Sequence, residues 1–63
     1  MTQTPRYNEK NTAVWQVQKL DDEATARRGY QVWQVLAILD WWHAEYEAGE
    51  LRKAGHLARV VHE

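Results

Sequence analysis

The chain has 63 residues, which is enough for one small domain that buries only about 60% of its unfolded surface. It contains no cysteine, which excludes disulfides and thiolate metal sites. Eight Lys and Arg against nine Asp and Glu give a formal net charge of −1, which argues against a general nucleic-acid binder. We therefore treat residues 1–63 as a single domain and expect oligomerisation or dense packing to supply additional stability.

The first segments in chain order are an arm and a strand. Residues 1–11 are polar, hold the only proline and show no period, which predicts a flexible arm. In the stretch "TAVWQVQKL", Ala13, Trp15 and Val17 alternate with the residues between them. The stretch is also rich in β-branched and aromatic residues, which favours a strand over residues 13–20. A helix remains open there, because Val14, Val17 and Leu20 are spaced by three.

A helix start follows in "LDDEATARR". Asp21 is a good N-cap, and Asp22 and Glu23 place negative charge in the first turn, where the helix dipole favours it. Gly29 interrupts this segment, since a glycine inside a helix costs about 1 kcal/mol relative to alanine. A break there would leave residues 30–35 as a second strand, and "VWQV" indeed occurs at both 14–17 and 32–35. Residues 30–35 can therefore be strand or helix.

The strongest helical pattern begins at Val32. A seam with steps of three and four is typical of an amphipathic helix and comprises Val32, Val35, Leu39, Trp42 and Tyr46. Gly49 is the expected C-cap. A second amphipathic segment begins at Leu51, although "HLARVV" within residues 56–62 could instead be a terminal strand.

These segments predict a mainly α domain that forms a dimer. An extended N-terminal segment with a short strand would precede a long central helix and a shorter C-terminal helix. The alternative is a small α+β domain in which a hairpin of residues 13–20 and 30–35 packs on one helix.

The predicted central helix is apolar on two opposite faces. Neighbouring residues point about 100° apart on a helix, so Trp42 would join the internal seam while Trp41 would point away from it. An uncovered face with two tryptophans is unusual on a soluble monomer. We therefore predict a partner-binding surface for a second copy or a larger host protein, made of Tyr30, Trp33, Ala37, Trp41, Ala44 and Ala48.

No residue pattern indicates chemistry. The chain has no serine, no cysteine and no glycine-rich phosphate loop. Asp40, His43 and Glu47 would share one helix edge, but a carboxylate-bridged metal site needs matching ligands from other helices. We predict no catalytic residue, no metal and no cofactor.

Nucleic-acid binding is the alternative function. A strand followed by two helices is the element order of ribbon-helix-helix repressors, and this resemblance covers element order only. In such a protein the strand would contact bases, and a basic stripe on the predicted C-terminal helix would contact phosphates. The candidate residues are Gln16, Gln18 and Lys19 on the strand and Arg52, Lys53 and Arg59 on the helix.

The preferred function is protein binding without catalysis. The sequence favours a small regulator, inhibitor or adaptor, of the kind that phages or mobile elements carry, working through a face of Trp and Ala side chains. No signal peptide or long apolar span is present, so we expect a cytoplasmic protein without membrane contact.

Overall fold

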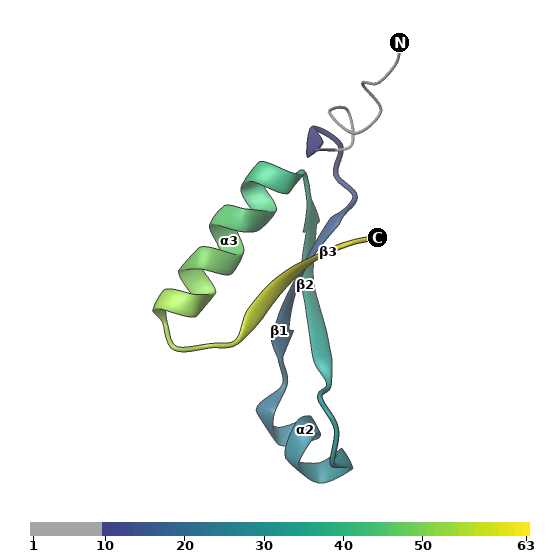
Figure 1. The fold of residues 1–63 in the computed structure, drawn as a ribbon, viewed down its shortest axis with the longest axis vertical. Coiled ribbons are helices and arrows are strands. Elements are labelled where there is room, and N and C mark those ends of the chain that lie inside the picture. Colours follow the sequence, from purple (N-terminus) through teal and green to yellow (C-terminus); the bar gives the residue numbers. More distant parts are fainter. Residues whose placement is uncertain (1–9) are drawn as a thin grey trace.

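The structure is a computed structural model that describes residues 10–63. From Trp15 to His62, three strands and two helices alternate (Figure 1). The elements are β1 (Trp15–Leu20), α2 (Asp22–Arg28), β2 (Trp33–Leu39), α3 (Trp41–Lys53) and β3 (Ala58–His62).

The strands form one antiparallel sheet in the order β2-β1-β3. Strand β1 is central and pairs with both neighbours, so that Trp15 lies opposite Leu39 on one side and His62 on the other. The register against β2 shifts between Val17 and Gln18, which lie opposite Ala37 and Val35, respectively. Leu36 is therefore the extra residue of a β-bulge in β2.

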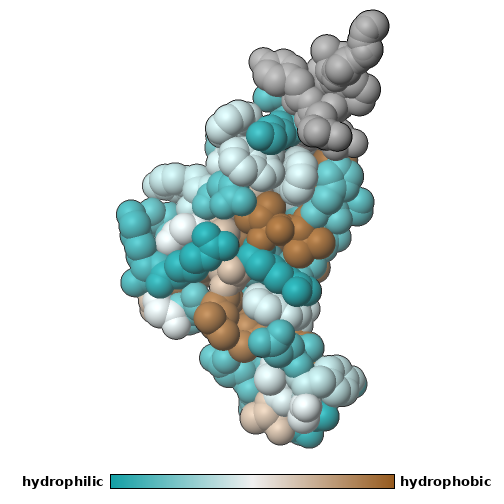
Figure 2. Space-filling view, viewed as in Figure 1, coloured by the Kyte–Doolittle hydropathy of each residue, from teal (hydrophilic) through white to brown (hydrophobic). Residues whose placement is uncertain are grey.

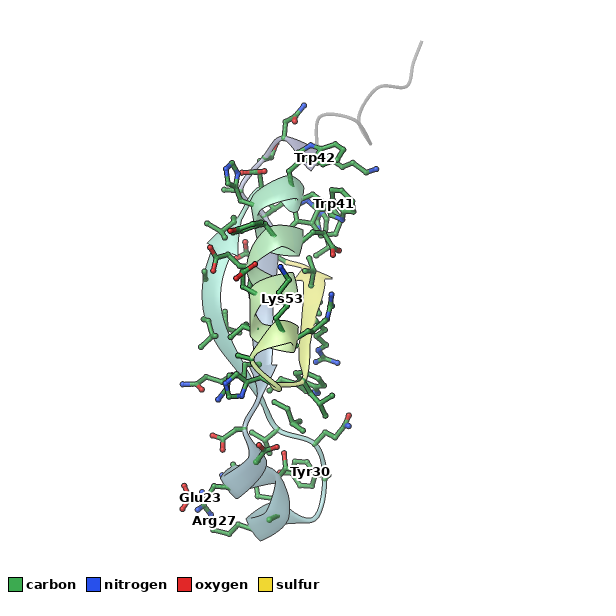
Figure 3. The ribbon with its side chains drawn as sticks, turned by 90° about the vertical axis from the view of Figure 1, so that its left-hand side faces the viewer. Glu23, Arg27, Tyr30, Trp41, Trp42 and Lys53 are labelled. Atoms are coloured by element: carbon green, nitrogen blue, oxygen red, sulfur yellow. The ribbon has the colours of Figure 1, made fainter. Side chains whose placement is uncertain are left out.

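Helix α3 packs on one face of the sheet, and this contact makes the core. In the view onto α3, β2 lies on one side of the helix and β3 on the other, so the helix lies over β1 (Figure 3). Val17, Ala44 and Ala48 are buried at this contact. Alanine has a short side chain, so the helix backbone can come close to the sheet at these two positions. Partly buried apolar side chains complete the core: Trp15, Leu39, Leu51, Ala58 and Val60.

Helix α2 forms the turn between β1 and β2 and lies at the far end of the hairpin (Figure 1). The Asp21 carboxylate accepts a hydrogen bond from the Ala24 amide at 3.0 Å, as its predicted N-cap role requires. Gly29 ends the helix with φ 81°, a left-handed conformation that glycine adopts without strain. The Thr25 hydroxyl then accepts a bond from the Val32 amide at 2.9 Å, which ties the end of the helix to the start of β2.

The predicted mainly α fold is wrong, because the segment expected to begin the central helix is a strand. All residues of β2 except Gln34 are apolar, so a helical spacing and a strand both fit the sequence. The helix begins only after Asp40, whose carboxylate accepts a hydrogen bond from the His43 amide at 3.1 Å. Helix α3 also continues through Gly49, which was the predicted C-cap, and ends at Lys53.

The predicted C-terminal helix is wrong as well. Gly55 has φ 92° and follows the end of α3, after which the chain returns as β3. The α+β alternative lies closer to the observed fold, since it contains the hairpin. Its second strand is Trp33–Leu39, however, and not 30–35, and the sheet gains a third strand. Residues 1–9 of the predicted arm lie outside the described residues.

Candidate functional site: the open face of the sheet

One face of the sheet is uncovered by any element of residues 10–63 (Figure 1). Side chains alternate between the two faces of a strand. Because Val17 faces α3, its neighbours Gln16 and Gln18 face away from the helix. Their paired residues on β2 and β3 share that orientation. We call this surface the open face; its residues are Gln16, Trp33, Val35, Ile38, Arg59 and Val61, together with Gln18 and Leu20, which are buried among their neighbours.

The bulge at Leu36 determines which residues of β2 belong to the open face. Before the bulge, Val35 pairs with Gln18 and points away from α3. After it, Ala37 pairs with Val17 and points toward the helix, so Ile38 again points away. A regular strand could not present both Val35 and Ile38 on one face, because their separation of three residues is odd.

The open face is more apolar than a solvated sheet face usually is. Antiparallel sheets with one solvated face normally carry polar side chains there. Here Val35 is 48% exposed and Ile38 is 43% exposed, with Trp33 and Val61 half-buried beside them. Figure 2 looks onto the β3 edge of the sheet, and there the apolar patches lie over β3 and the loop that leads into it, whereas the outer side of α3 in that view is mostly polar.

A chain of polar contacts crosses the same face. The Gln18 amide donates to Gln16 Oε1 at 2.7 Å, and Arg59 Nε donates to Gln18 Oε1 at 2.7 Å. The Arg59 guanidinium in turn lies 4.1 Å from the centroid of the Trp33 ring. These contacts satisfy Gln18, a polar side chain that is only 8% exposed.

Arg59 is the only charged side chain of the open face, and the three strands contain no acidic residue. Its Nε is used by Gln18, and among the described residues no acceptor is bonded to its terminal nitrogens. The guanidinium is therefore fixed by a hydrogen bond and an aromatic ring while its outer donors remain available for a ligand.

The six predicted partner-binding residues do not lie on one surface. Trp33 is on the open face, and Ala37 lies on the covered face of the sheet. Ala44 and Ala48 are fully buried beneath the sheet, so they cannot contact a partner in this fold. Trp41 is half-buried at the start of α3. Tyr30 is exposed after α2, where its hydroxyl accepts from Arg28 at 3.3 Å.

The doubled tryptophan is arranged opposite to the prediction. Trp42 is 57% exposed and Tyr46 is 64% exposed, whereas Trp41 is half-buried. The two indole rings meet edge to face with centroids 4.7 Å apart (Figure 3). The Lys10 ammonium lies 4.7 Å from the centroid of the Trp41 ring. The prediction is wrong because it placed the side chains of Trp41 and Trp42 by their angles from Leu39 on a single helix, whereas Leu39 lies in a strand.

The candidate nucleic-acid contacts are divided between two regions. Gln16, Gln18 and Arg59 meet on the open face, but Lys19 points to the other face. Arg52 and Lys53 lie at the end of α3, where the Arg52 guanidinium donates to the Ala58 carbonyl at 3.1 and 3.2 Å. Strand β1 is paired on both edges, so it cannot form the intermolecular ribbon that the ribbon-helix-helix arrangement requires.

Asp40 and His43 act together at the start of α3. The His43 ring and amide both bond to the Asp40 carboxylate. The hydrogen bond from the His43 side chain is the main reason why the pKa of Asp40 is lowered from its ordinary value. Among the described residues no group of three or more His, Asp or Glu side chains could hold a metal ion. This pair is therefore a helix cap.

Val35, Ile38 and Val61 are surface residues that the sequence did not predict as such. Recognising β2 and β3 as strands would have placed them opposite the core, because their positions follow from alternation and pairing. The bulge itself leaves no signal in the sequence.

Comparison of the chain with protein-family models, with curated proteins and with solved structures finds no match. Within residues 10–63, neither helix has the length and apolar character needed to cross a membrane.

Proposed function

We propose that this protein is a non-enzymatic protein-binding domain whose open face is covered by a protein partner. The observation that carries the proposal is an antiparallel sheet with a helix on one face and, on the other, apolar side chains that no element of residues 10–63 covers. Val35 and Ile38 expose nearly half of their surface on that face. Covering them removes apolar area from water, which contributes about 25 cal/mol per Å².

The small core gives further support. Val17 is the only large side chain that is fully buried among the described residues, and its immediate buried neighbours are two alanines. A domain of this size has little margin of stability. Binding of a partner to the folded state would add stability by mass action.

The residue types of the open face suit a binding role. Trp and Arg are the residues most often found at the energetic centres of interfaces, and here Trp33 and Arg59 lie in contact. Gln18 is bonded to both Gln16 and Arg59, and the face has a single cation, so the face suits nucleic acid less well than it suits a protein. A regulator, inhibitor or adaptor in the cytoplasm remains our proposal, and the lack of cysteine is compatible with that compartment.

The test compares a charge placed on the open face with the same charge placed on α3. A tagged chain isolates candidate partners from the native host, and each candidate is then purified and titrated against the isolated chain. Ile38→Lys should weaken the complex by about tenfold or more, since it puts a charge into the apolar contact. Glu47→Lys, an exposed position on α3, should leave the affinity unchanged. The proposal fails if no purified protein, including the chain itself, binds saturably, or if Ile38→Lys binds as well as the wild type.

A further inference from the structure

The open face combines one fixed cation with apolar surroundings, and this combination defines the chemistry of its partner. We infer that the face binds a protein surface on which a carboxylate is surrounded by apolar side chains, with the carboxylate bound to the Arg59 guanidinium. The inference rests on the proposed function and specifies the partner surface that it requires.

Arg59 is held in a position suited to bind a carboxylate. Its Nε donates to Gln18 at 2.7 Å, and its guanidinium lies 4.1 Å from the Trp33 centroid, so both the stem and the plane of the group are restrained. The terminal nitrogens have no acceptor among the described residues. A guanidinium presents two parallel N–H donors that match the two oxygens of a carboxylate. Because the group is already ordered, less side-chain entropy is lost on binding.

The surroundings of Arg59 explain why the partner surface must also be apolar. Val61 lies on the same strand and the same face, and Val35 lies on the other outer strand opposite Gln18. Apolar contacts around a charged pair exclude water and strengthen its hydrogen bonds. A free acidic peptide with no apolar residues would leave these side chains in water and would bind weakly.

A second copy of the chain does not supply the required group from its strands. None of the three strands contains Asp or Glu, so face-to-face stacking through the strands would bury two Arg59 side chains without a counter-charge. The nearest acidic residue along β3 is Glu63, which follows the strand and whose amide donates to the Val14 carbonyl. Self-association through Glu63 is thus a distinct arrangement that the experiment must separate.

The test begins with selection of random short peptides displayed on phage against the wild-type chain. A parallel selection uses Arg59→Gln. Peptides enriched only by the wild type should carry Asp or Glu next to apolar residues. One such peptide and its Glu→Gln or Asp→Asn counterpart are then synthesised and titrated against both chains. Each single change should weaken binding about tenfold, and the two together should cost little more than one alone, because they remove the same pair.

Matched variants show whether the effect belongs to the guanidinium. Arg59→Lys keeps the charge but loses the planar pair of donors, so its affinity should fall between those of the wild type and Arg59→Gln. Arg27→Gln, on α2 at the far end of the hairpin, should bind as the wild type does. Amide NMR spectra of each variant establish that it is folded at the assay temperature.

Several results would overturn the inference. The first is that no peptide is enriched, and the second is that the enriched peptides carry no acidic residue. The third is that the losses of affinity from Arg59→Gln and from the change in the peptide add up when the two are combined. A wild-type chain that sediments as a dimer and returns to monomer in Glu63→Gln would assign Arg59 to a second copy. Binding of a single-stranded oligonucleotide at low salt with loss in Arg59→Gln would assign it to phosphate.

The experiments distinguish failure of the carboxylate inference from failure of the proposed protein-binding function. A purified partner whose binding depends on Ile38 but not on Arg59 would keep the protein-binding role and overturn the carboxylate. If binding depends on neither residue, both conclusions fall.

Discussion

Arg59 and Trp33 lie in contact across the sheet although they come from its two outer strands. The guanidinium is 4.1 Å from the centroid of the indole, with Gln18 of the central strand bonded to the same arginine. This contact therefore links β2 to β3 over β1 on the face that α3 does not cover. It is also a contribution to stability that depends on the strand order β2-β1-β3.

Replacing Arg59 by methionine should lower the free energy of unfolding by about 1 kcal/mol. The change keeps a long apolar stem but removes the cation–π contact and the bond to Gln18. Chemical denaturation followed by tryptophan fluorescence measures the loss. In a double-mutant cycle, Arg59→Met should cost less stability when Trp33 has been replaced by leucine. Arg27→Met is the control, and it should change the free energy of unfolding by less than about 0.5 kcal/mol. Equal losses in the presence and absence of Trp33 would mean that the ring contributes nothing.

The two buried alanines of α3 should not tolerate larger side chains. Ala48 is fully buried between the helix and the sheet, so Ala48→Leu must push the two layers apart and should destabilise by about 1–3 kcal/mol or prevent folding. Ala26→Leu is the matched control, because Ala26 lies exposed on α2 and its change should be nearly neutral. Circular dichroism during thermal unfolding compares the variants. A stable, well-folded Ala48→Leu would contradict the position of α3.

The sequence favoured a strand at β1 while leaving a helix open, and it predicted the Asp21 cap and an interruption of α2 at Gly29, because each depends on local chemistry. Alternation favoured the strand, a carboxylate next to free amides indicated the cap, and the cost of a glycine inside a helix indicated the interruption.

The remainder depends on tertiary contacts that leave no local signal. The run from Val32 to Leu39 fits both a helix and a buried strand, and pairing with β1 decides between them. The open face could not be assigned without that strand. Because Ala44 and Ala48 are small, they suit either a partner helix or a close sheet, and the sequence does not distinguish the two.

Two glycines should respond in opposite directions to alanine. Gly29 has φ 81°, where a Cβ is strained, so Gly29→Ala should destabilise by about 1 kcal/mol. Gly49 lies within α3, and an added Cβ would meet nothing within 4 Å. Gly49→Ala should therefore stabilise by about 0.5–1 kcal/mol, since alanine loses less backbone entropy in a helix. Thermal unfolding of both variants tests this, and a change of the same sign in both would be inconsistent with the observed conformations.

The cap at Asp40 should make stability depend on acid pH. The pKa of Asp40 is lowered in the folded state, mainly by the hydrogen bond from the His43 side chain. A lowered folded pKa contributes stability above the unfolded pKa of about 3.9, and that contribution is lost as pH falls through the folded value. Asp40→Asn should therefore unfold with a flatter pH profile below about pH 4 than the wild type. Denaturation at a series of pH values measures the difference, and parallel profiles would show that Asp40 does not contribute.

The neighbouring tryptophans at the start of α3 should differ in their effect on stability. Trp41 is half-buried and Trp42 is 57% exposed, although the rings touch edge to face. Trp41→Ala removes packed area and should cost about 1–2 kcal/mol, whereas Trp42→Ala should cost less than about 1 kcal/mol. Denaturant titration followed by circular dichroism avoids the loss of fluorescence that either change causes. If Trp42→Ala were the more damaging variant, Trp42 would face the interior, as the helical seam with Leu39 and Tyr46 predicted, and the helix start at Asp40 would need revision.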